Sequence, residues 1–283
     1  MGSDFVLHRS CRPKLEVGRG DIHAGTFRLL GMLKARNRAR TISAMVKQEG
    51  KDPDTATIKV VVLGPNGPEE RDVTVASMMA EAAPLEPLGR DCAGCDACVF
   101  QASFGCFGYV NYPLTASPER WVVERIQAAD TLGGDLLLRA IRDFGYDGSA
   151  MADWRRRPEL CERSTPLEAI VAKGFLSKKR VSTDQIFQAL FRVGNTLDPA
   201  HCMGVLMWLG ALRVQGSVPG PGTSGNPAAL IALTSATTSE QRRAIASLEV
   251  GANAVESEIR GFQRLLQGLY MAWVLDLPLL MDA

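Results

Sequence analysis

Four of the seven cysteines lie close together, in the segment DCAGCDACVFQASFGCFGYVNYP. Their spacing is C-x2-C-x2-C-x7-C, and the four residues are Cys92, Cys95, Cys98 and Cys106. Two-residue gaps let a loop turn so that successive sulfur atoms face one centre, and thiolates are soft donors that suit zinc and iron–sulfur clusters. The sequence therefore predicts a metal centre with these four cysteines as its ligands.

The triple C-x2-C-x2-C favours a [4Fe–4S] cluster. It resembles the ligand loop of ferredoxins, which use this triple and add a remote fourth thiolate. The resemblance is to a ligand spacing over about fifteen residues, and it departs from the ferredoxin pattern where Phe107 follows the last cysteine in place of proline. Small residues such as Gly94 let backbone amides approach the sulfurs. Four aromatic residues are expected to shield the centre from water: Phe100, Phe104, Phe107 and Tyr109.

Zinc is the alternative cofactor. Structural zinc sites more often use two separated cysteine pairs, and the second pair is missing here. Cys98 or His23 would then act as the fourth ligand beside Cys92, Cys95 and Cys106. Two further interpretations stay open: a thiol–disulfide pair at the C-x-x-C step, and cysteines that only fill space around an aromatic loop. The remaining cysteines are isolated in the sequence and are expected to be structural: Cys11, Cys161 and Cys202.

The sequence offers little sign of group-transfer chemistry. Its three histidines, His8, His23 and His201, show no metal-ligand spacing. Neither G-x-S-x-G nor H-E-x-x-H occurs, and the glycine-rich stretch Gly18–Thr26 lacks the lysine of a P-loop. We expect no catalytic residues, and any catalysis to be electron transfer through the metal centre.

The composition argues against a partner that binds through the overall charge of the chain. Hydrophobic residues make up 46% of the chain and charged residues 22%, which is usual for a globular protein. The net charge of +1 gives no overall field that would hold nucleic acid or an anionic membrane. Three short basic runs, at Lys34 to Arg40, Arg155 to Arg157 and Lys178 to Arg180, are interpreted as solvated faces. Nucleic-acid binding is therefore not expected.

The chain is also expected to stay out of the membrane. Its most apolar segments, Val205 to Val214 and Tyr270 to Met281, are too short to span a bilayer. Residues 1–30 lack the pattern of a signal peptide. We therefore expect a cytoplasmic protein, in which clustered cysteines are metal ligands or redox groups more often than disulfides.

The predicted fold is mainly α: a helical bundle with a small N-terminal β-hairpin and a Cys-rich metal loop. Residues 1–116 are expected to form a mixed α/β region. It contains a helix over residues 27–46 and a hairpin whose strands, residues 58–63 and 73–75, flank the turn Pro65–Pro68. The cysteine loop follows the hairpin and closes this region.

Residues 117–215 are expected to form a helical domain, because capping signals recur there. Ser117-Pro118, Thr165-Pro166 with Glu168, and Asp198-Pro199 each combine a cap with a first-turn proline. Ser182 and Gln185 form a fourth capping pair. Residues 216–229, rich in glycine, proline and serine, are predicted to be a flexible linker.

Residues 230–283 are expected to form one long helix from about Ser239 to Leu275. Apolar residues recur there at intervals of three and four, which indicates a heptad-like seam. The seam is expected to pair with a protein partner or a second copy, or else to pack on the helices of residues 117–214. The residues expected to make this contact are Ile245, Leu248, Val255, Ile259, Phe262, Leu266, Leu269 and Trp273.

Together these patterns predict a cytoplasmic metal-binding protein that acts as a regulator, sensor or assembly partner. A zinc-stabilised scaffold without catalysis is one alternative function. An electron-relay subunit of a redox enzyme is the other.

Overall fold

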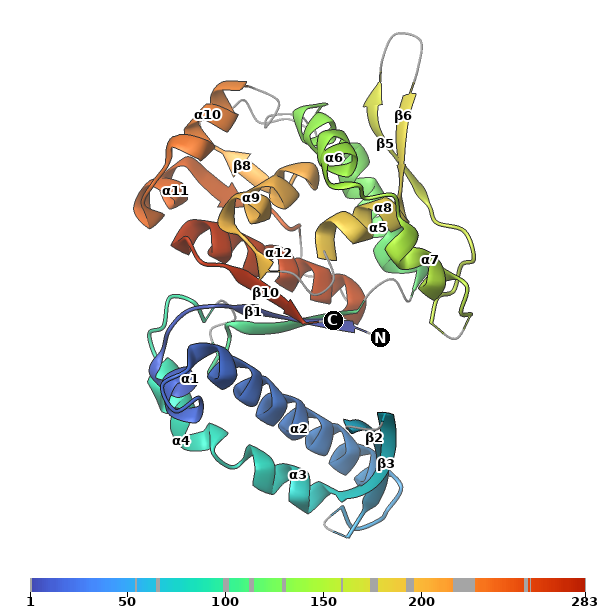
Figure 1. Cartoon of the computed structure of the whole chain (residues 1–283), viewed down its shortest axis with the longest axis vertical. Coiled ribbons are helices and arrows are strands. Elements are labelled where there is room, and N and C mark those ends of the chain that lie inside the picture. Colours follow the sequence, from blue (N-terminus) through green and yellow to red (C-terminus); the bar gives the residue numbers. More distant parts are fainter. Residues whose placement is uncertain are drawn as a thin grey trace. The chain divides into compact units, whose positions relative to one another are not determined.

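The structure is a computed structural model, and its described residues fold mainly into helices. It describes residues 2–53, 55–64, 67–98, 102–111, 115–128, 131–158, 160–173, 178–191, 196–215, 227–251, 254 and 256–282. Twelve α-helices and several small antiparallel sheets occur in this part of the chain, so the prediction of a mainly α fold is confirmed. The chain forms two compact units (Figure 1). In the sequence, the smaller unit lies between two segments of the larger one.

The inserted unit comprises Ser10–Cys98 and Ala102–Phe104. Its longest element is helix α2, Ile22–Gln48, which exceeds the predicted helix at both ends. The other elements, in chain order, are α1 (Arg12–Val17), β2 (Thr57–Gly64), β3 (Gly67–Thr74), α3 (Val75–Ala82), α4 (Leu85–Gly89) and the 3-10 helix η1 (Arg90–Cys92).

Local sequence explains how α2 starts and how α1 packs on it. The Asp21 carboxylate caps α2 by accepting the backbone N–H groups of His23 at 2.8 Å and Ala24 at 3.2 Å. One turn later, Gly25 lies against the backbone of α1. A Cβ at this position would sit 1.8 Å from the Lys14 carbonyl oxygen, so the close contact requires glycine.

The far half of α2 packs on α3 and the β2–β3 sheet. Strands β2 and β3 pair antiparallel from Thr57↔Thr74 to Gly64↔Gly67, and Pro65 and Asn66 of the predicted turn lie outside the described residues. A small core joins the three elements: Ala39, Val75 and Met78 are buried, with Ala35, Ile42, Ala56, Ile58 and Val73 packed around them.

The main unit comprises Met1–Arg9, Val99–Gln101 and Gly105–Ala283. Its central sheet has the strand order β4-β1-β10-β7 and joins both ends of the chain. The strands are β1 (Gly2–Leu7), β4 (Phe107–Asn111), β7 (Thr196–Leu197) and β10 (Leu279–Asp282). Because β1 and β4 pair within this sheet, the units do not follow the predicted division between residues 116 and 117.

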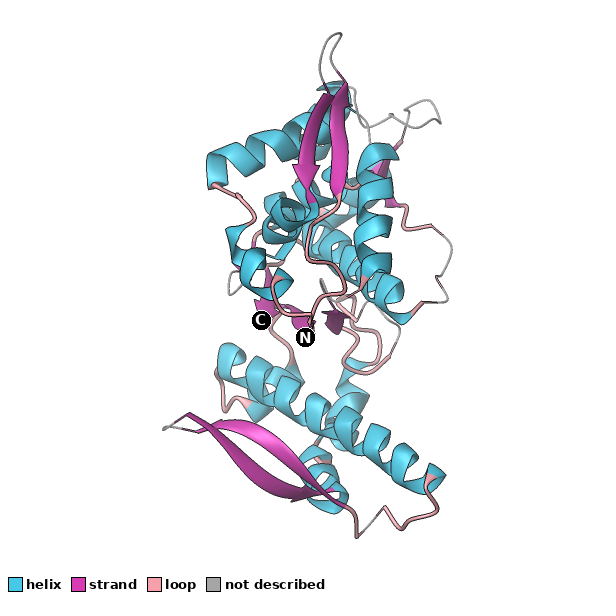
Figure 2. Cartoon of the chain, turned by 90° about the vertical axis from the view of Figure 1, so that its right-hand side faces the viewer, coloured by secondary structure: helices cyan, strands magenta, loops and turns pink. Residues whose placement is uncertain are grey.

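Most of the other elements of the main unit are helices. In chain order they are α5 (Ala116–Ala128), α6 (Thr131–Phe144), α7 (Ser149–Arg155), α8 (Thr183–Phe191), α9 (Pro199–Trp208), α10 (Pro227–Ser235), α11 (Ser239–Ile245) and α12 (Ser257–Leu275). Two further strand pairs are β5 (Glu168–Lys173) with β6 (Lys178–Ser182), and β8 (Leu212–Val214) with β9 (Ala246–Leu248). The β5–β6 pair forms a two-stranded ribbon, and β5 packs on α5 and α6 (Figure 2).

The capping signals predicted some helix starts correctly. The Asp198 carboxylate caps α9 by accepting the His201 N–H at 2.7 Å. Ser182 and Gln185 bond reciprocally at the start of α8. The signal at Thr165 was misleading, since Glu168 begins strand β5 and not a helix. A capping pattern alone cannot distinguish these outcomes, because strand pairing with β6 decides the second one.

The prediction of one long C-terminal helix is wrong. Helix α11 ends at Ile245, where β9 pairs with β8, and α12 begins only at Ser257. Residues 216–226 of the predicted linker lie outside the described residues, and α10 occupies Pro227–Ser235. The heptad-like spacing therefore runs across three separate elements.

The seam of α12 is the core of the main unit. Four of its predicted partner-binding residues are 3% exposed or less: Phe262, Leu266, Leu269 and Trp273. Helix α12 packs on β1, β4 and β10 on one side and on α9 and α5 on others (Figure 1). Ile245, Leu248 and Ile259 are half-buried, and Val255 lies outside the described residues. The apolar seam is thus covered by the chain itself.

A buried ion cluster ties three helices together. The Arg155 guanidinium of α7 donates to Glu119 of α5 and to Asp184 of α8, and all three side chains are at least nine-tenths buried. The Thr183 hydroxyl also donates to Glu119 Oε1, at 3.0 Å. Since buried charges are tolerated only when paired, this cluster fixes how α5, α7 and α8 meet.

Candidate functional site

The cysteine segment of the inserted unit is a chain of tight turns. Helix η1 ends at Cys92, and the Cys95 N–H then donates to the Cys92 carbonyl at 3.2 Å. Gly94, at φ 72°, supplies the left-handed residue that this turn needs. The Cys98 N–H donates to the Cys95 carbonyl at 2.9 Å, which closes a second turn. Two successive turns therefore bring Cys98 back beside Cys92.

The Cys92 thiol is the centre of this arrangement. Burial disfavours its thiolate and is the main reason that its pKa is raised to about 11. The backbone N–H of Phe104 donates to the Cys92 sulfur and acts in the opposite direction. The Cys98 thiol, hydrogen-bonded to Cys92, and the nearby Cys11 raise the pKa further, because neighbouring thiolates repel one another.

Cys11, which the sequence analysis treated as an isolated structural cysteine, is a neighbour of the Cys92 thiol. It is the N-cap residue of α1, far from Cys92 in the sequence. Helices α1 and η1 contact each other, and an ion pair at 3.3 Å joins Arg12 to Asp91, the residues that follow Cys11 and precede Cys92. No spacing rule links Cys11 to the segment, so only the packing of α1 on η1 reveals it.

The structure brings together part of the predicted ligand set. Cys92, Cys95 and Cys98 are half-buried residues of the inserted unit, whereas Cys106 is a buried residue of the main unit. Within the described ranges, no group of three or more His, Cys, Asp or Glu side chains is close enough to hold a metal ion. His23, the alternative ligand, packs edge-to-face on Phe27 at 4.8 Å.

The expected aromatic shield is incomplete. Phe104 is 4% exposed, so this ring is buried as expected. Tyr109 is 49% exposed, and Phe100 lies outside the described residues. The shielding of the Cys92 thiol therefore comes from the local turns and from Phe104, whose backbone also supplies the N–H donor.

The contact between Cys92 and Cys98 suits a shared ion better than a cluster. Thiolates bound tetrahedrally to one zinc ion at about 2.3 Å lie about 3.8 Å apart, which is close to sulfur–sulfur contact. A [4Fe–4S] cluster instead places each thiolate on its own iron, at separate corners of a cube. The Cys92–Cys98 contact is closer to the first arrangement, and in the described residues no third side chain completes a metal-holding group with this pair.

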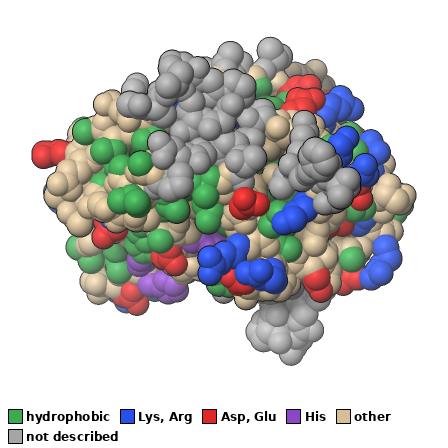
Figure 3. Space-filling view, turned by 90° about the horizontal axis from the view of Figure 1, so that it is seen from above, with side chains coloured by type: hydrophobic (Ala, Val, Ile, Leu, Met, Phe, Trp, Pro, Cys, Tyr) green, Lys and Arg blue, Asp and Glu red, His purple; other side chains and the backbone are tan. Residues whose placement is uncertain are grey.

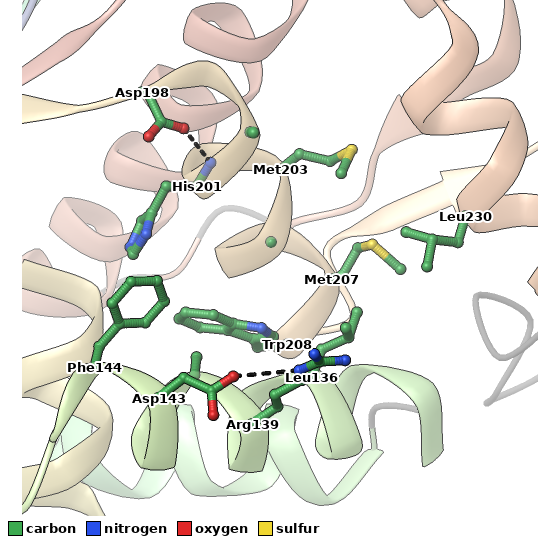
Figure 4. Close-up of a pocket in the computed structure, with 13 residues that line it drawn as sticks. Leu136, Arg139, Asp143, Phe144, Asp198, His201, Met203, Met207, Trp208 and Leu230 are labelled. Carbon is green, nitrogen blue, oxygen red and sulfur yellow. Dashed lines mark hydrogen bonds and ion pairs between the residues drawn. The ribbon is translucent and has the colours of Figure 1, made fainter.

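A second feature, which the sequence analysis missed, is a pocket of about 620 Å³ in the main unit. It lies between α6, α9 and α10, and apolar side chains form most of its wall (Figure 4). The apolar side chains drawn are Leu136, Phe144, Met203, Met207, Trp208 and Leu230. A pocket of this size and polarity is typical of sites that take a drug-sized apolar molecule.

The polar groups of the pocket are already engaged. Arg139 Nε pairs with Asp143 Oδ2 at 3.2 Å, and Asp198 caps the backbone of α9. The His201 ring packs edge-to-face on Trp208 at 5.6 Å. The apolar wall is therefore the part of the pocket that remains available to a ligand.

The exposure of apolar side chains is the feature that would have indicated the pocket. Helix α9 was interpreted as a core helix because it is almost wholly apolar, and most of it is buried. Phe144, a lining residue that is 59% exposed, marks the open side of the pocket. Figure 3 shows hydrophobic side chains gathered on the part of the surface toward α10, at the left of the view.

Comparison with known proteins gives no further guide. No protein family, curated protein or solved structure matches the chain. None of the helices in the described part of the chain is both long enough and apolar enough to cross a membrane.

Proposed function

We propose that this chain is a thiolate metal-binding protein whose inserted unit holds one zinc ion through Cys92, Cys98 and Cys11. The ion would join η1 to the start of α1 and so fix the inserted unit around α2. In a reducing cytoplasm such a site is stable as metal–thiolate rather than disulfide. The protein would act as a regulator, sensor or assembly partner through the surfaces that the ion holds in place.

The contact of Cys92 with Cys98 is the observation that carries this proposal. Two half-buried thiols in contact cannot both ionise without repulsion, and the nearby Cys11 adds to this repulsion. A divalent cation removes this penalty, because it stabilises every thiolate around it. The Phe104 amide, which donates to the Cys92 sulfur, is the type of outer donor that supports a bound thiolate.

A [4Fe–4S] cluster is the second candidate, and the spacing of Cys92, Cys95 and Cys98 favours it. In this case Cys106 would supply the remote fourth thiolate. The two candidates use different cysteines outside the shared pair. Cys11 is a ligand only in the zinc site, and Cys106 only in the cluster.

Metal content of single-cysteine variants tests both candidates. Protein purified without oxygen is analysed for zinc, iron and sulfide, as wild type and as C98S, C11S, C106S and C161S. The zinc site predicts about one zinc per chain, lost in C98S and weakened in C11S but kept in C106S. Iron and sulfide lost in C106S but kept in C11S would establish the cluster instead.

Cys161 is the matched control, because it is a buried cysteine outside the segment. C161S should keep the metal of the wild type. Wild-type protein without bound metal, from medium supplied with both zinc and iron, would contradict both candidates.

A further inference from the structure

Helix α2 carries an unbalanced charge. Between Ile22 and Gln48 it contains six Lys or Arg residues and no Asp or Glu. The basic residues are Arg28, Lys34, Arg36, Arg38, Arg40 and Lys47. The net charge of the whole chain, +1, conceals this concentration because acidic residues lie elsewhere. Four of the six stand in the C-terminal half of the helix, and Lys34 lies just before its midpoint.

One side of this half is buried and the opposite side is open. Ala35, Ala39 and Ile42 face the core formed with α3 and the β2–β3 sheet. With 3.6 residues per turn, the opposite side is formed by residues that again recur every three or four positions. They are Asn37, Thr41, Ala44 and Gln48, and all four are exposed. This strip is small and uncharged.

Cations border the strip on both sides. Helical spacing places Lys34 and Arg38 along one edge, and Arg36, Arg40 and Lys47 along the other. Of these, Lys34, Arg38, Arg40 and Lys47 are exposed. The open face of α2 is therefore a neutral strip, with polar amide and hydroxyl groups, between two rows of positive charge.

In the described part of the chain, no acidic side chain pairs with Arg36, Arg38 or Arg40, so the charge of these three arginines is not neutralised there. The pKa of Arg36 is lowered, first by burial and then by the like charge of Arg40 one turn away. The Arg36 Nε is buried without a hydrogen-bond partner among the described residues. Like charges at this spacing destabilise a helix, and a bound anion relieves them.

We propose that the C-terminal half of α2 binds in the major groove of B-form DNA. The groove, about 12 Å wide, admits one α-helix, with base edges at its floor and a phosphate strand on each side. The strip from Asn37 to Gln48 would meet the base edges, and the two cation rows would meet the two strands. The proposal goes beyond the metal site and does not rest on it.

The arrangement favours duplex DNA over other polyanions. The major groove of A-form RNA is too deep and narrow for side chains to read. Binding to single strands relies on aromatic side chains that stack on bases, and the strip has none. A membrane-bound helix would present large apolar residues between its cations, whereas Asn37 and Thr41 occupy this position.

Fluorescence anisotropy with a labelled DNA duplex, measured over a series of salt concentrations, tests the proposal on the full chain. Each phosphate contact contributes about −0.9 to the slope of log K against log salt. Removing two contacts in R38Q/R40Q should lower the magnitude of the slope by about 1.8 and weaken binding by about tenfold or more. R40Q alone should give an intermediate slope.

The control removes the same charge elsewhere. Lys178 and Lys179 are exposed residues of β6 in the main unit, and K178Q/K179Q should keep the wild-type slope. Circular dichroism of each variant confirms that α2 is folded. The proposal is overturned if the wild type does not bind the duplex, or if K178Q/K179Q weakens binding as much as R38Q/R40Q. Equal or tighter binding to an RNA duplex, a single strand or vesicles of anionic phospholipid would also overturn it.

Discussion

The Cys92 thiol is hydrogen-bonded to the Cys98 thiol, two turns further along the chain. This relationship brings one pair of the predicted ligands into contact. It also makes Cys92 harder to ionise, because the neighbouring Cys98 adds to the effect of burial and raises the pKa of the Cys92 thiol.

The stability of the metal-free protein should fall at alkaline pH in a way that depends on Cys92. The pKa of this thiol rises from its ordinary value of 9.0 to about 11 in the folded chain. The folded state therefore holds the proton more tightly than the unfolded state. Its contribution is complete below about pH 9 and is lost as pH rises to about 11. Urea unfolding of wild type and C92S, each without metal, should show the extra loss only in the wild type; equal pH profiles would contradict it.

Arg155→Met should destabilise the main unit strongly. It leaves the buried carboxylates of Glu119 and Asp184 without their cation, and breaking such a pair costs about 3–5 kcal/mol. The neighbouring Arg156→Met is the matched control, because the Arg156–Asp153 pair is more than two-thirds exposed on both sides. This control should change the free energy of unfolding by less than about 1 kcal/mol. Urea unfolding of both variants makes the comparison, and similar losses would show that the cluster is not decisive.

Two glycines of α2 should respond to alanine in opposite ways. A Cβ at Gly25 would lie 1.8 Å from the Lys14 carbonyl oxygen, so Gly25→Ala must push α1 away. A Cβ at Gly31 would meet nothing within 4 Å, and alanine there should stabilise the helix by about 0.5–1 kcal/mol. Thermal unfolding measures both changes. Stabilisation by Gly25→Ala would contradict the described packing of α1 on α2.

The pocket of the main unit should bind an apolar fluorescent dye. Gly204 lines it, and a Cβ at Gly204 would make only ordinary contacts with the Trp208 ring, at 3.8 Å. Gly204→Leu should therefore leave the fold intact, fill the pocket and abolish binding of the dye. Ala244→Leu adds apolar bulk to the exposed surface of α11 and should leave binding unchanged. Dye fluorescence against protein concentration gives both affinities, and unaltered binding by Gly204→Leu would place the dye elsewhere.

Local features of the fold were predictable from sequence, and long-range pairing was not. Asp198 and the Ser182–Gln185 pair cap their helices because these bonds form between near neighbours. The pairing of β1 with β10 joins the two ends of the chain, and no local pattern indicates it. The apolar spacing near Ile245 continues through a strand, because periodicity shows which residues are buried and not where a helix stops.

In the candidate site, too, contacts between near neighbours in the sequence were predictable and contacts between distant residues were not. The spacing of Cys92 and Cys98 in the sequence was sufficient to expect their approach. Cys11 could not be found in this way, since it joins the pair only through packing of α1 on η1. The basic run of α2 was visible in the sequence, but its neutral strip is apparent only once burial shows which side of the helix is open.

X-ray absorption at the zinc edge tests the central claim most directly. Wild-type protein purified without oxygen should show a shell of sulfur ligands at about 2.3 Å, including Cys92, Cys98 and Cys11. The C11S variant should show one sulfur fewer, and C161S should match the wild type. A sulfur shell unchanged in C11S and C98S, or a metal bound only by nitrogen and oxygen, would contradict the account.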